Sequence, residues 1–263
     1  MRNNTDWSFL IGGTVALQER AIRTRRAILV AAAEVFDEVG YEAATITEIL
    51  KRSGLTRGAL YFHFGSKEEL AQGVLAVQVE ALPPVPRQEL RLQESLDEAL
   101  LLAYLLRRES GDPIVRGSVR LTIDQGAAQG GLDARIPMAA WVEHTHALLN
   151  EAKTNGELLP HVDTLSLAKL AVGAFTGVQV LSNIMTDRED MPERVSDLYR
   201  NLMAAAAVPA VLSRLDFTSG RGPWIYQEAM KLRQADAEAQ AVQADAQAQA
   251  VPGGAEAEAE AEA

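Results

Sequence analysis

The stretch TITEILKRSGLTRGALYFHFGSKEEL, from Thr45 to Leu70, decides the fold of the amino-terminal part of the chain. Thr45 followed three residues later by Glu48 forms a capping-box pattern, which predicts the start of a short helix. A tight turn that contains glycine separates this helix from Thr56, which can cap a second short helix. Two short helices joined by such a turn predict a helix-turn-helix motif.

Two flanking helices complete the predicted domain. Apolar residues recur at helical spacing between Thr24 and Val39, and Gly40 then supplies a stop signal. Ser66 opens another capping box, so a fourth helix is predicted to run to about Val79. The motif is therefore expected within a small helical domain.

The second short helix carries the side chains that we expect to contact DNA. Arg57 can donate two hydrogen bonds to a guanine edge, and the small Gly58 and Ala59 let the helix backbone approach the bases. The exposed face also carries Thr56, and the other expected contacts are of types that bind phosphate: Thr45, Thr47, Tyr61, His63 and Lys67. For Tyr61 and His63 the alternative to a phosphate contact is packing between helices. We assign Phe62 and Phe64 to the core.

A basic cluster stands at the start of the first helix, and it consists of Arg20, Arg23, Arg25 and Arg26. A solvated helix start would also explain these arginines. Their place ahead of the motif favours contacts with phosphates, with Arg23 singled out, and such contacts make DNA binding depend on salt.

Composition and charge agree with this assignment. The chain has 263 residues, of which 48% are hydrophobic and 5% aromatic, and this favours an all-α fold. The net charge of -11 is concentrated away from the motif, because the tail from Gln234 carries seven acids and no base. Between Arg20 and Gly65 there are seven bases and five acids, so the predicted DNA-binding part is mildly basic.

The prolines at 83, 84 and 86 mark a joint between two domains. Beyond them, a bundle of about six helices is expected at 87–108, 113–128, 137–155, 164–186, 192–207 and 223–235. The chain thus divides into an unstructured extension (1–17), a helix-turn-helix domain (18–80), a ligand-binding and dimerisation domain (81–235) and an acidic low-complexity tail (236–263), which we expect to be disordered or a fraying helix.

Several classes of function are disfavoured by what the sequence lacks. It has no cysteine, which removes disulfides and thiolate metal sites and suits a cytoplasmic protein. No apolar run approaches the roughly 20 residues of a membrane span, and Asp6 argues against a signal peptide. No phosphate loop, dinucleotide fingerprint or metal motif appears, and His144 and His146 do not share a helical face. We therefore expect neither an enzyme nor a bound cofactor or metal.

The segment from Thr45 to Leu70 resembles the DNA-binding domain of the TetR family. In that family the recognition helix runs into a Leu-Tyr-aromatic-His-Phe motif, which corresponds here to residues 60–64. Longer stretches resemble the gamma-butyrolactone receptors of antibiotic-producing filamentous soil bacteria: RAIRTR, AATITEIL, GALYFHF, SKEELA, RGSVRLTIDQG, IPMAAWVEHT, NGELLPHVDT and GAFTGVQV. The resemblance spans about Gln18 to Phe217. It implies a dimeric repressor that a lactone signal releases from operator DNA at antibiotic genes. Because these receptors usually begin near Gln18, we expect Val15 to mark the native start.

A lactone with an alkyl tail needs an apolar cavity and a few polar groups that orient it. The resemblance places Trp141 at the ligand pocket, and Gln78 and Thr176 each interrupt an apolar helix face. An ordinary core tryptophan and two interhelical hydrogen bonds are the alternatives for these three residues. Gln78 also lies on the fourth helix, so movement of that helix would change the spacing of two recognition helices in a homodimer formed by 164–186 and 192–207.

Three other functions compete with this reading of the sequence. An enzyme would turn over lactones. A TetR-type regulator that senses an antibiotic or drug and controls efflux would keep the DNA-binding domain and change the ligand. A helical interaction protein without DNA would leave the capped recognition helix unexplained, and a gel shift with operator DNA distinguishes it.

Overall fold

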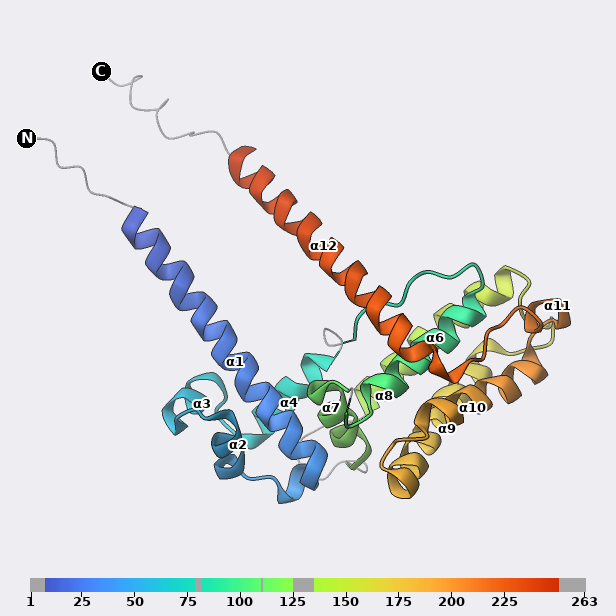
Figure 1. Cartoon of the computed structure of the whole chain (residues 1–263), viewed down its shortest axis with the longest axis horizontal. Helices are drawn as coiled ribbons and strands as arrows, with labels where there is room; N and C mark the ends of the chain where they lie inside the picture. The colour runs from blue at the N-terminus through green and yellow to red at the C-terminus, as the bar shows by residue number, and fades with distance from the viewer. Residues whose placement is uncertain (1–7, 79–81, 110, 125–134, 251–263) are drawn as a thin grey trace, which may run out of the picture.

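The computed structural model of the chain describes residues 8–78, 82–109, 111–124 and 135–250. Within these ranges the predicted all-α fold is confirmed, and the one β-type contact is an isolated bridge between Leu158 and Ala207. Figure 1 shows an amino-terminal group of helices beside a larger bundle. The helices are α1 (Ser8–Ala43), α2 (Ile46–Ser53), α3 (Arg57–His63), α4 (Lys67–Ala76), α6 (Arg91–Leu105), α7 (Pro113–Asp124), α8 (Arg135–Thr154), α9 (Thr164–Thr186), α10 (Met191–Ala206), α11 (Pro209–Leu212), η1 (Ser219–Arg221) and α12 (Gly222–Ala250).

Helix α1 is longer than its sequence pattern predicted. We expected residues 1–17 to be unstructured, but α1 already begins at Ser8, so the expectation is wrong for residues 8–17. Residues 1–7 lie outside the described ranges. The predicted stop is present as a break at Gly40, whose φ of 74° and ψ of 174° leave the helical region. The run VALQERA consists largely of good helix formers, which favours extension of the helix toward the amino terminus.

Helices α1 to α4 share a core built around the fully buried Phe36 of α1, Ile49 of α2, Leu60 of α3 and Leu70 of α4. Ile114 and Leu121 of α7 belong to the same core. The predicted division at residue 80 thus does not separate the two cores, because α7 packs on α1 and α4.

Gly117 explains how α7 approaches α1 so closely. A Cβ atom at this position would lie 2.4 Å from the carbonyl oxygen of Ala33, a distance that forces the helices apart. Ser118, the next residue, donates a hydrogen bond to the carbonyl of Val74 on α4 at 3.2 Å. Helix α7 is therefore fixed to both α1 and α4 by small residues of the RGSVRLTIDQG stretch.

The second core surrounds α6, which contacts α8, α10 and α12. The first turn of α6 is capped from a distance, because the carboxylate of the buried Glu157 accepts hydrogen bonds from the backbone N–H groups of Arg91 at 3.0 Å and Leu92 at 2.9 Å. All six predicted helices of this domain are present, with α9 at its predicted bounds and short elements α11 and η1 added.

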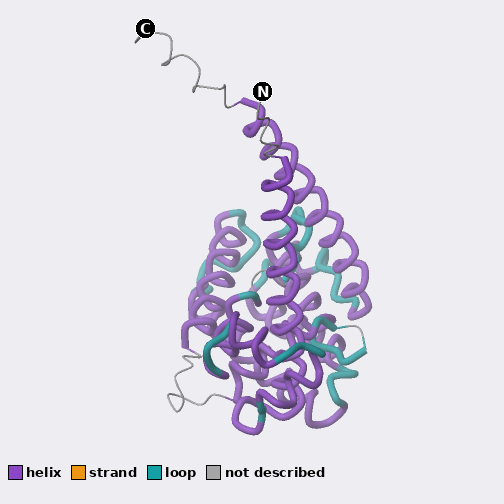
Figure 2. The backbone as a smooth tube through the Cα atoms, turned by 90° about the vertical axis from the view of Figure 1, so that its left-hand side faces the viewer, coloured by secondary structure: helices purple, strands orange, loops and turns teal. Residues whose placement is uncertain are grey.

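Helix α12 continues to Ala250, so the segment 236–250 of the expected disordered or fraying tail is helical. Residues 251–263 lie outside the described ranges. The first turns of α1 and the last turns of α12 project in the same direction, away from the rest of the molecule (Figures 1 and 2).

Helix α9 has an unusual composition. It alone among the described helices is long and apolar enough to cross a membrane by length and composition, with a mean hydropathy of 1.4. The expectation that no apolar run approaches the length of a membrane span is therefore wrong for this helix. Only 28% of that window is buried. One face lines a cavity, and another exposes large apolar side chains, including Leu170 at 55% and Ile184 at 71%.

Candidate DNA interface and ligand cavity

The helix-turn-helix is held by local caps. Thr45 Oγ1 accepts a hydrogen bond from the N–H of Glu48, and Thr56 Oγ1 accepts one from the N–H of Ala59, both at 3.2 Å. Gly54 ends α2 in the left-handed region with φ of 67°, a conformation that favours glycine. These caps set the start of α3 and the turn before it.

The solvent-facing side of α2 and α3 carries most of the expected DNA contacts. Exposed residues are Thr45, Thr47, Thr56, Arg57, Gly58 and Tyr61, while Ala59 and His63 are half-buried. A Cβ atom at Gly58 would meet no atom within 4 Å, so the backbone there faces open space. The Arg57 guanidinium lies over the Tyr61 ring at 5.5 Å. The basic residues Arg20, Arg23, Arg25 and Arg26 are exposed on α1.

The assignment of both phenylalanines of the motif to the core is half right. Phe64 is buried, but Phe62 is 81% exposed, so its assignment is wrong. Positions 60 and 64 share one face of a helix, whereas position 62 points to the other side. Phe62 makes an edge contact with the His63 ring at 5.0 Å and otherwise adds an apolar side chain to the exposed surface.

Lys67 has contacts within the protein. Its ammonium donates to the carbonyl oxygens of Tyr41, Glu42 and Ala44 at 2.8, 3.3 and 3.1 Å, and it lies 4.4 Å from the centre of the Tyr41 ring. An ammonium group has three donors, and all three have acceptors here. Lys67 therefore caps the carboxyl end of α1, and we leave it out of the proposed DNA contacts.

The three residues expected at the ligand site line one inner chamber, although they come from three different parts of the chain. Gln78 follows α4, Trp141 lies on α8 and Thr176 lies on α9. This chamber has a volume of about 70 Å³. A larger outer chamber of about 380 Å³ adjoins it and is lined by apolar groups that include Pro83 and Pro84. The two share Gln78, Glu98, Leu102 and Trp141 in their walls.

The inner chamber offers several polar groups that sequence reasoning missed. The hydroxyl of Thr176 donates to Val172 O at 2.9 Å, and that of Thr122 donates to Ser118 O at 2.8 Å, so each threonine oxygen keeps only acceptor capacity for a ligand. Tyr199 Oη lies 3.5 Å from Ser95 Oγ, and burial raises the pKa of Tyr199 to about 12. The phenol thus stays neutral and can donate.

A hydrogen-bonded pair of a histidine and a carboxylate lies where the two chambers adjoin. His144 Nε2 lies 2.9 Å from a carboxylate oxygen of Glu98, and this hydrogen bond raises the pKa of His144 against the opposing effect of burial. Glu98 lines both chambers and His144 lines the outer one. The pair links α6 to α8 at the boundary.

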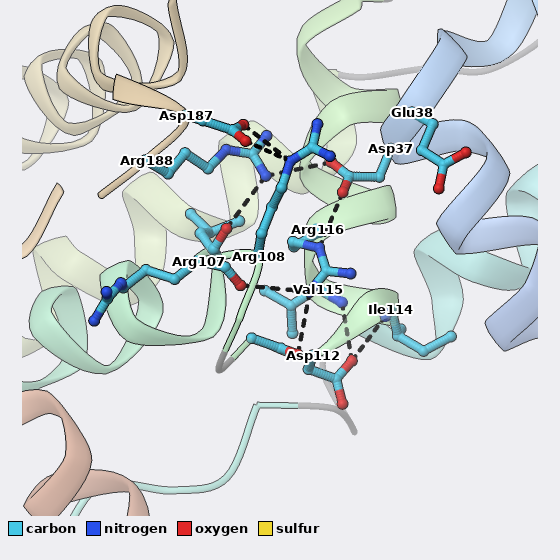
Figure 3. Close-up of polar contacts among 12 residues, drawn as sticks. Asp37, Glu38, Arg107, Arg108, Asp112, Ile114, Val115, Arg116, Asp187 and Arg188 are labelled. Carbon is cyan, nitrogen blue, oxygen red and sulfur yellow. Dashed lines mark hydrogen bonds and ion pairs between the residues drawn. The ribbon is translucent and has the colours of Figure 1, made fainter. Parts of the chain in front are cut away.

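A polar junction connects the DNA-binding helices to the bundle, as Figure 3 shows. The carboxylate of Asp37 on α1 accepts a hydrogen bond from Arg116 Nε of α7 at 2.9 Å. It also accepts one from Arg188 Nη1, in the turn after α9, at 3.3 Å. Arg188 is 4% exposed and also donates to the carbonyl of Leu106 at 3.3 Å. Burial lowers the pKa of Arg188, and Asp37 opposes this. We refer to Asp37, Arg116 and Arg188 as the Asp37 junction.

Sequence reasoning missed the Asp37 junction because its members are far apart in the chain. The turn after α9 has an unusual backbone, with positive φ at Asp187 and Arg188, of 52° and 68°. This conformation is uncommon for residues other than glycine, and it is visible only in the structure. Exposed ion pairs such as Arg108 with Asp187 at 2.8 Å complete the cluster (Figure 3).

Comparisons with known proteins agree with the fold and the motif. A family model described as "Bacterial regulatory proteins, tetR family" matches residues 28–74. The A-factor receptor protein of Streptomyces griseus is 35% identical over 226 residues, which cover 86% of this chain and 79% of that protein.

Solved structures extend the similarity over the bundle. Full-length native TylP, a TetR regulator from Streptomyces fradiae, has 59% identity and a TM-score of 0.72, with 80% of this chain and 99% of that chain covered. A gamma-butyrolactone receptor described as an ArpA-like protein has 28% identity and a TM-score of 0.63, with 80% and 99% covered.

These relatives are transcription regulators that act through DNA rather than enzymes. The capped recognition helix, the all-helical bundle behind it and the extent of the match to the A-factor receptor lead to one conclusion. The chain is a DNA-binding transcription regulator and belongs to the TetR family, within which it is similar to the gamma-butyrolactone receptors.

Proposed function

We propose that this regulator is a dimeric, cytoplasmic repressor that a gamma-butyrolactone-type signal releases from operator DNA at genes of antibiotic production. The observation that carries the proposal is the meeting of Gln78, Trp141 and Thr176 at one cavity. The cavity is bordered by apolar and aromatic walls with a few polar groups, which suits a neutral molecule with an alkyl tail.

The cavity also adjoins the helix that carries the DNA-binding motif. Gln78 lies two residues beyond the end of α4, and three residues separate α4 from α3. A ligand that pulls on Gln78 therefore acts on the helix behind the recognition helix. A tenfold loss of operator affinity requires that the ligand prefer the non-binding state by about 1.4 kcal/mol.

The inner chamber is too small for such a ligand as it stands. An alkyl lactone needs more space than about 70 Å³, and pockets for small molecules usually measure about 300–1,000 Å³. Its tail must occupy the outer chamber, or the boundary at Trp141 must open. Either event changes the contacts between α8 and the residues that follow α4.

A second copy of the chain is the partner that we propose for the exposed face of α9. Leu165, Leu181 and Met185 are among its exposed apolar side chains. An exposed apolar face of this kind suits a protein interface, and symmetric dimers place two recognition helices about 34–36 Å apart, one turn of DNA.

We propose DNA contacts at the exposed surface of α2 and α3 and at the arginines of α1. Arg57 would read a base, Gly58 and Ala59 allow close approach, and phosphate contacts come from Arg23, Thr45, Thr47, Thr56, Tyr61 and His63.

A gel shift of promoter DNA with and without synthetic lactones tests the proposal. Trp141→Ala is expected to keep DNA binding and to lose release by lactone, whereas Trp224→Ala, on the exposed surface of α12, keeps both. Release of the Trp141→Ala protein at the normal lactone concentration would contradict the assignment of the pocket. Release of the wild type by an antibiotic instead of a lactone would favour the efflux regulator.

A further inference from the structure

Two largely buried glutamines of the inner chamber are free to hydrogen-bond a molecule in it. Gln78 and Gln179 are each 5% exposed, and neither amide group hydrogen-bonds to any residue within the described ranges. Neither amide is among the fully enclosed atoms without a partner, of which Arg188 Nε is the one within the described ranges, so both amides reach the space of the cavity. Two amides on one cavity are therefore available to a molecule that enters it.

A third buried glutamine shows the usual arrangement. Gln93 is 7% exposed, its amide nitrogen donates to Asp97 Oδ1 at 2.8 Å, and its amide oxygen accepts from the N–H of Asp216 at 2.8 Å. Gln93 is thus satisfied by its own fold on both sides. Gln78 and Gln179 differ from it in facing a cavity.

The two amides reach the cavity from different walls. Gln179 lies on α9, three residues after Thr176 and four after Phe175, so all three share the face of α9 that lines the chamber. Gln78 lies two residues beyond the end of α4. A molecule that bonds both amides joins the DNA-binding part of the chain to α9.

We propose that Gln179 is a ligand-binding and specificity-determining residue, and that the ligand is a neutral molecule with two separate polar groups, one bonded by Gln78 and one by Gln179. This rests on the proposed function. Each amide offers both a donor and an acceptor, which suits a carbonyl or a hydroxyl. The carboxylate at this cavity, Glu98, is already paired with His144, so no free charge at the described walls calls for an ionic ligand.

A ligand bonded to both amides would couple the cavity to the positions of the recognition helices. The face of α9 opposite to the cavity carries exposed apolar residues such as Leu181 and Ile184, which we assigned to the second copy. A ligand held between Gln78 and Gln179 therefore pulls α4 against the helix that dimerises. The positions of the two recognition helices then depend on the length of the ligand between its polar groups.

Calorimetric titration of the whole protein with three synthetic probes tests this inference. The probes are a gamma-butyrolactone with a hydroxylated alkyl chain, the same lactone without the hydroxyl, and the hydroxylated cyclic ether without the carbonyl. The wild type is expected to bind the first probe at least about tenfold more tightly than either of the others. Gln179→Met should lose one of these two preferences and Gln78→Met the other, while Gln227→Met, on the exposed face of α12, keeps both.

Thermal unfolding without ligand separates this role from a structural one. Methionine has a similar length and no unpaired amide, so Gln179→Met should unfold at the wild-type temperature or above it. A fall of several degrees, or a Gln179→Met protein that keeps both preferences, would overturn the inference while leaving the lactone-responsive repressor in place. If no lactone binds the wild type, the proposed function fails, and this inference fails with it.

Discussion

The recognition surface and the ligand cavity use polar residues in opposite ways. On α2 and α3 the polar side chains face water or cap their own helices, as Thr45 and Thr56 do. In the cavity, the amides of Gln78, just beyond α4, and Gln179, on α9, reach the enclosed space and have no hydrogen-bond partner within the described ranges. The first arrangement needs nothing beyond its own few residues, whereas the second leaves two amides available to a molecule that fills the cavity. The Asp37 junction joins α1 to α7 and to the turn after α9.

The largest effect is expected at the Asp37 junction, which joins α1 to α7 and to the turn after α9. Asp37→Asn removes the negative charge that Arg116 and the buried Arg188 share, and loss of one partner of a buried pair costs about 3–5 kcal/mol. Urea unfolding measures this loss. Asp187→Asn, which removes an equal charge from an exposed pair with Arg108, should cost less than about 1 kcal/mol. Equal losses in the two variants would show that the junction is no stronger than a surface pair.

The next effect tests whether Lys67 belongs to the recognition surface or to the fold. Lys67→Met removes three hydrogen bonds from a charged donor to α1 and should lower the free energy of unfolding by about 1.5–3 kcal/mol. The salt dependence of DNA binding should not change. Lys51→Met, at an exposed lysine on α2, is the control for stability. A stable Lys67→Met protein with a shallower salt dependence would return Lys67 to the DNA contacts.

The recognition surface itself is tested by Arg57→Ala. Loss of a guanine contact should weaken operator binding by about 1–3 kcal/mol in a quantitative gel shift. Because Arg57 is exposed, the unfolding temperature should stay the same. Binding to unrelated DNA should fall by less, and equal losses on both DNAs would identify Arg57 as a phosphate contact instead.

A smaller effect concerns the local caps. Thr56→Ala removes the hydrogen bond to the N–H of Ala59 and should destabilise the protein by about 1 kcal/mol in urea unfolding. Thr56→Ser keeps the hydroxyl and should restore most of that stability. An unchanged unfolding midpoint in Thr56→Ala would mean that packing alone fixes the start of α3.

The smallest effect lies at the cavity and depends on pH. The pKa of His144 is raised in the folded protein, chiefly by its hydrogen bond to Glu98. The pair therefore contributes its full stability below the unfolded pKa of about 6.5 and loses it as pH rises through the raised folded pKa. Thermal unfolding as a function of pH should show this loss in the wild type and not in His144→Gln. The exposed His161→Gln serves as the control and should keep the wild-type profile.

The chain's own pattern determined the helices and the DNA-binding motif, because caps, glycine stops and apolar spacing act within a few residues. Thr45, Gly54 and Thr56 could be assigned to their roles from sequence for this reason. The sequence pattern also indicated Gln78, Trp141 and Thr176, but only as separate candidates for ligand binding. No local rule brings the end of α4 together with α8 and α9.

Tertiary structure alone decided which side chains are paired and which are not. Phe62 is exposed because Leu60 and Phe64 take the inner face of the same turn, and Lys67 has acceptors because α1 ends beside α4. Gln179 differs from Gln93 only in what surrounds it. The hydrogen bonds of a buried group depend on residues that are distant in the chain, and packing, which is not local, sets those distances.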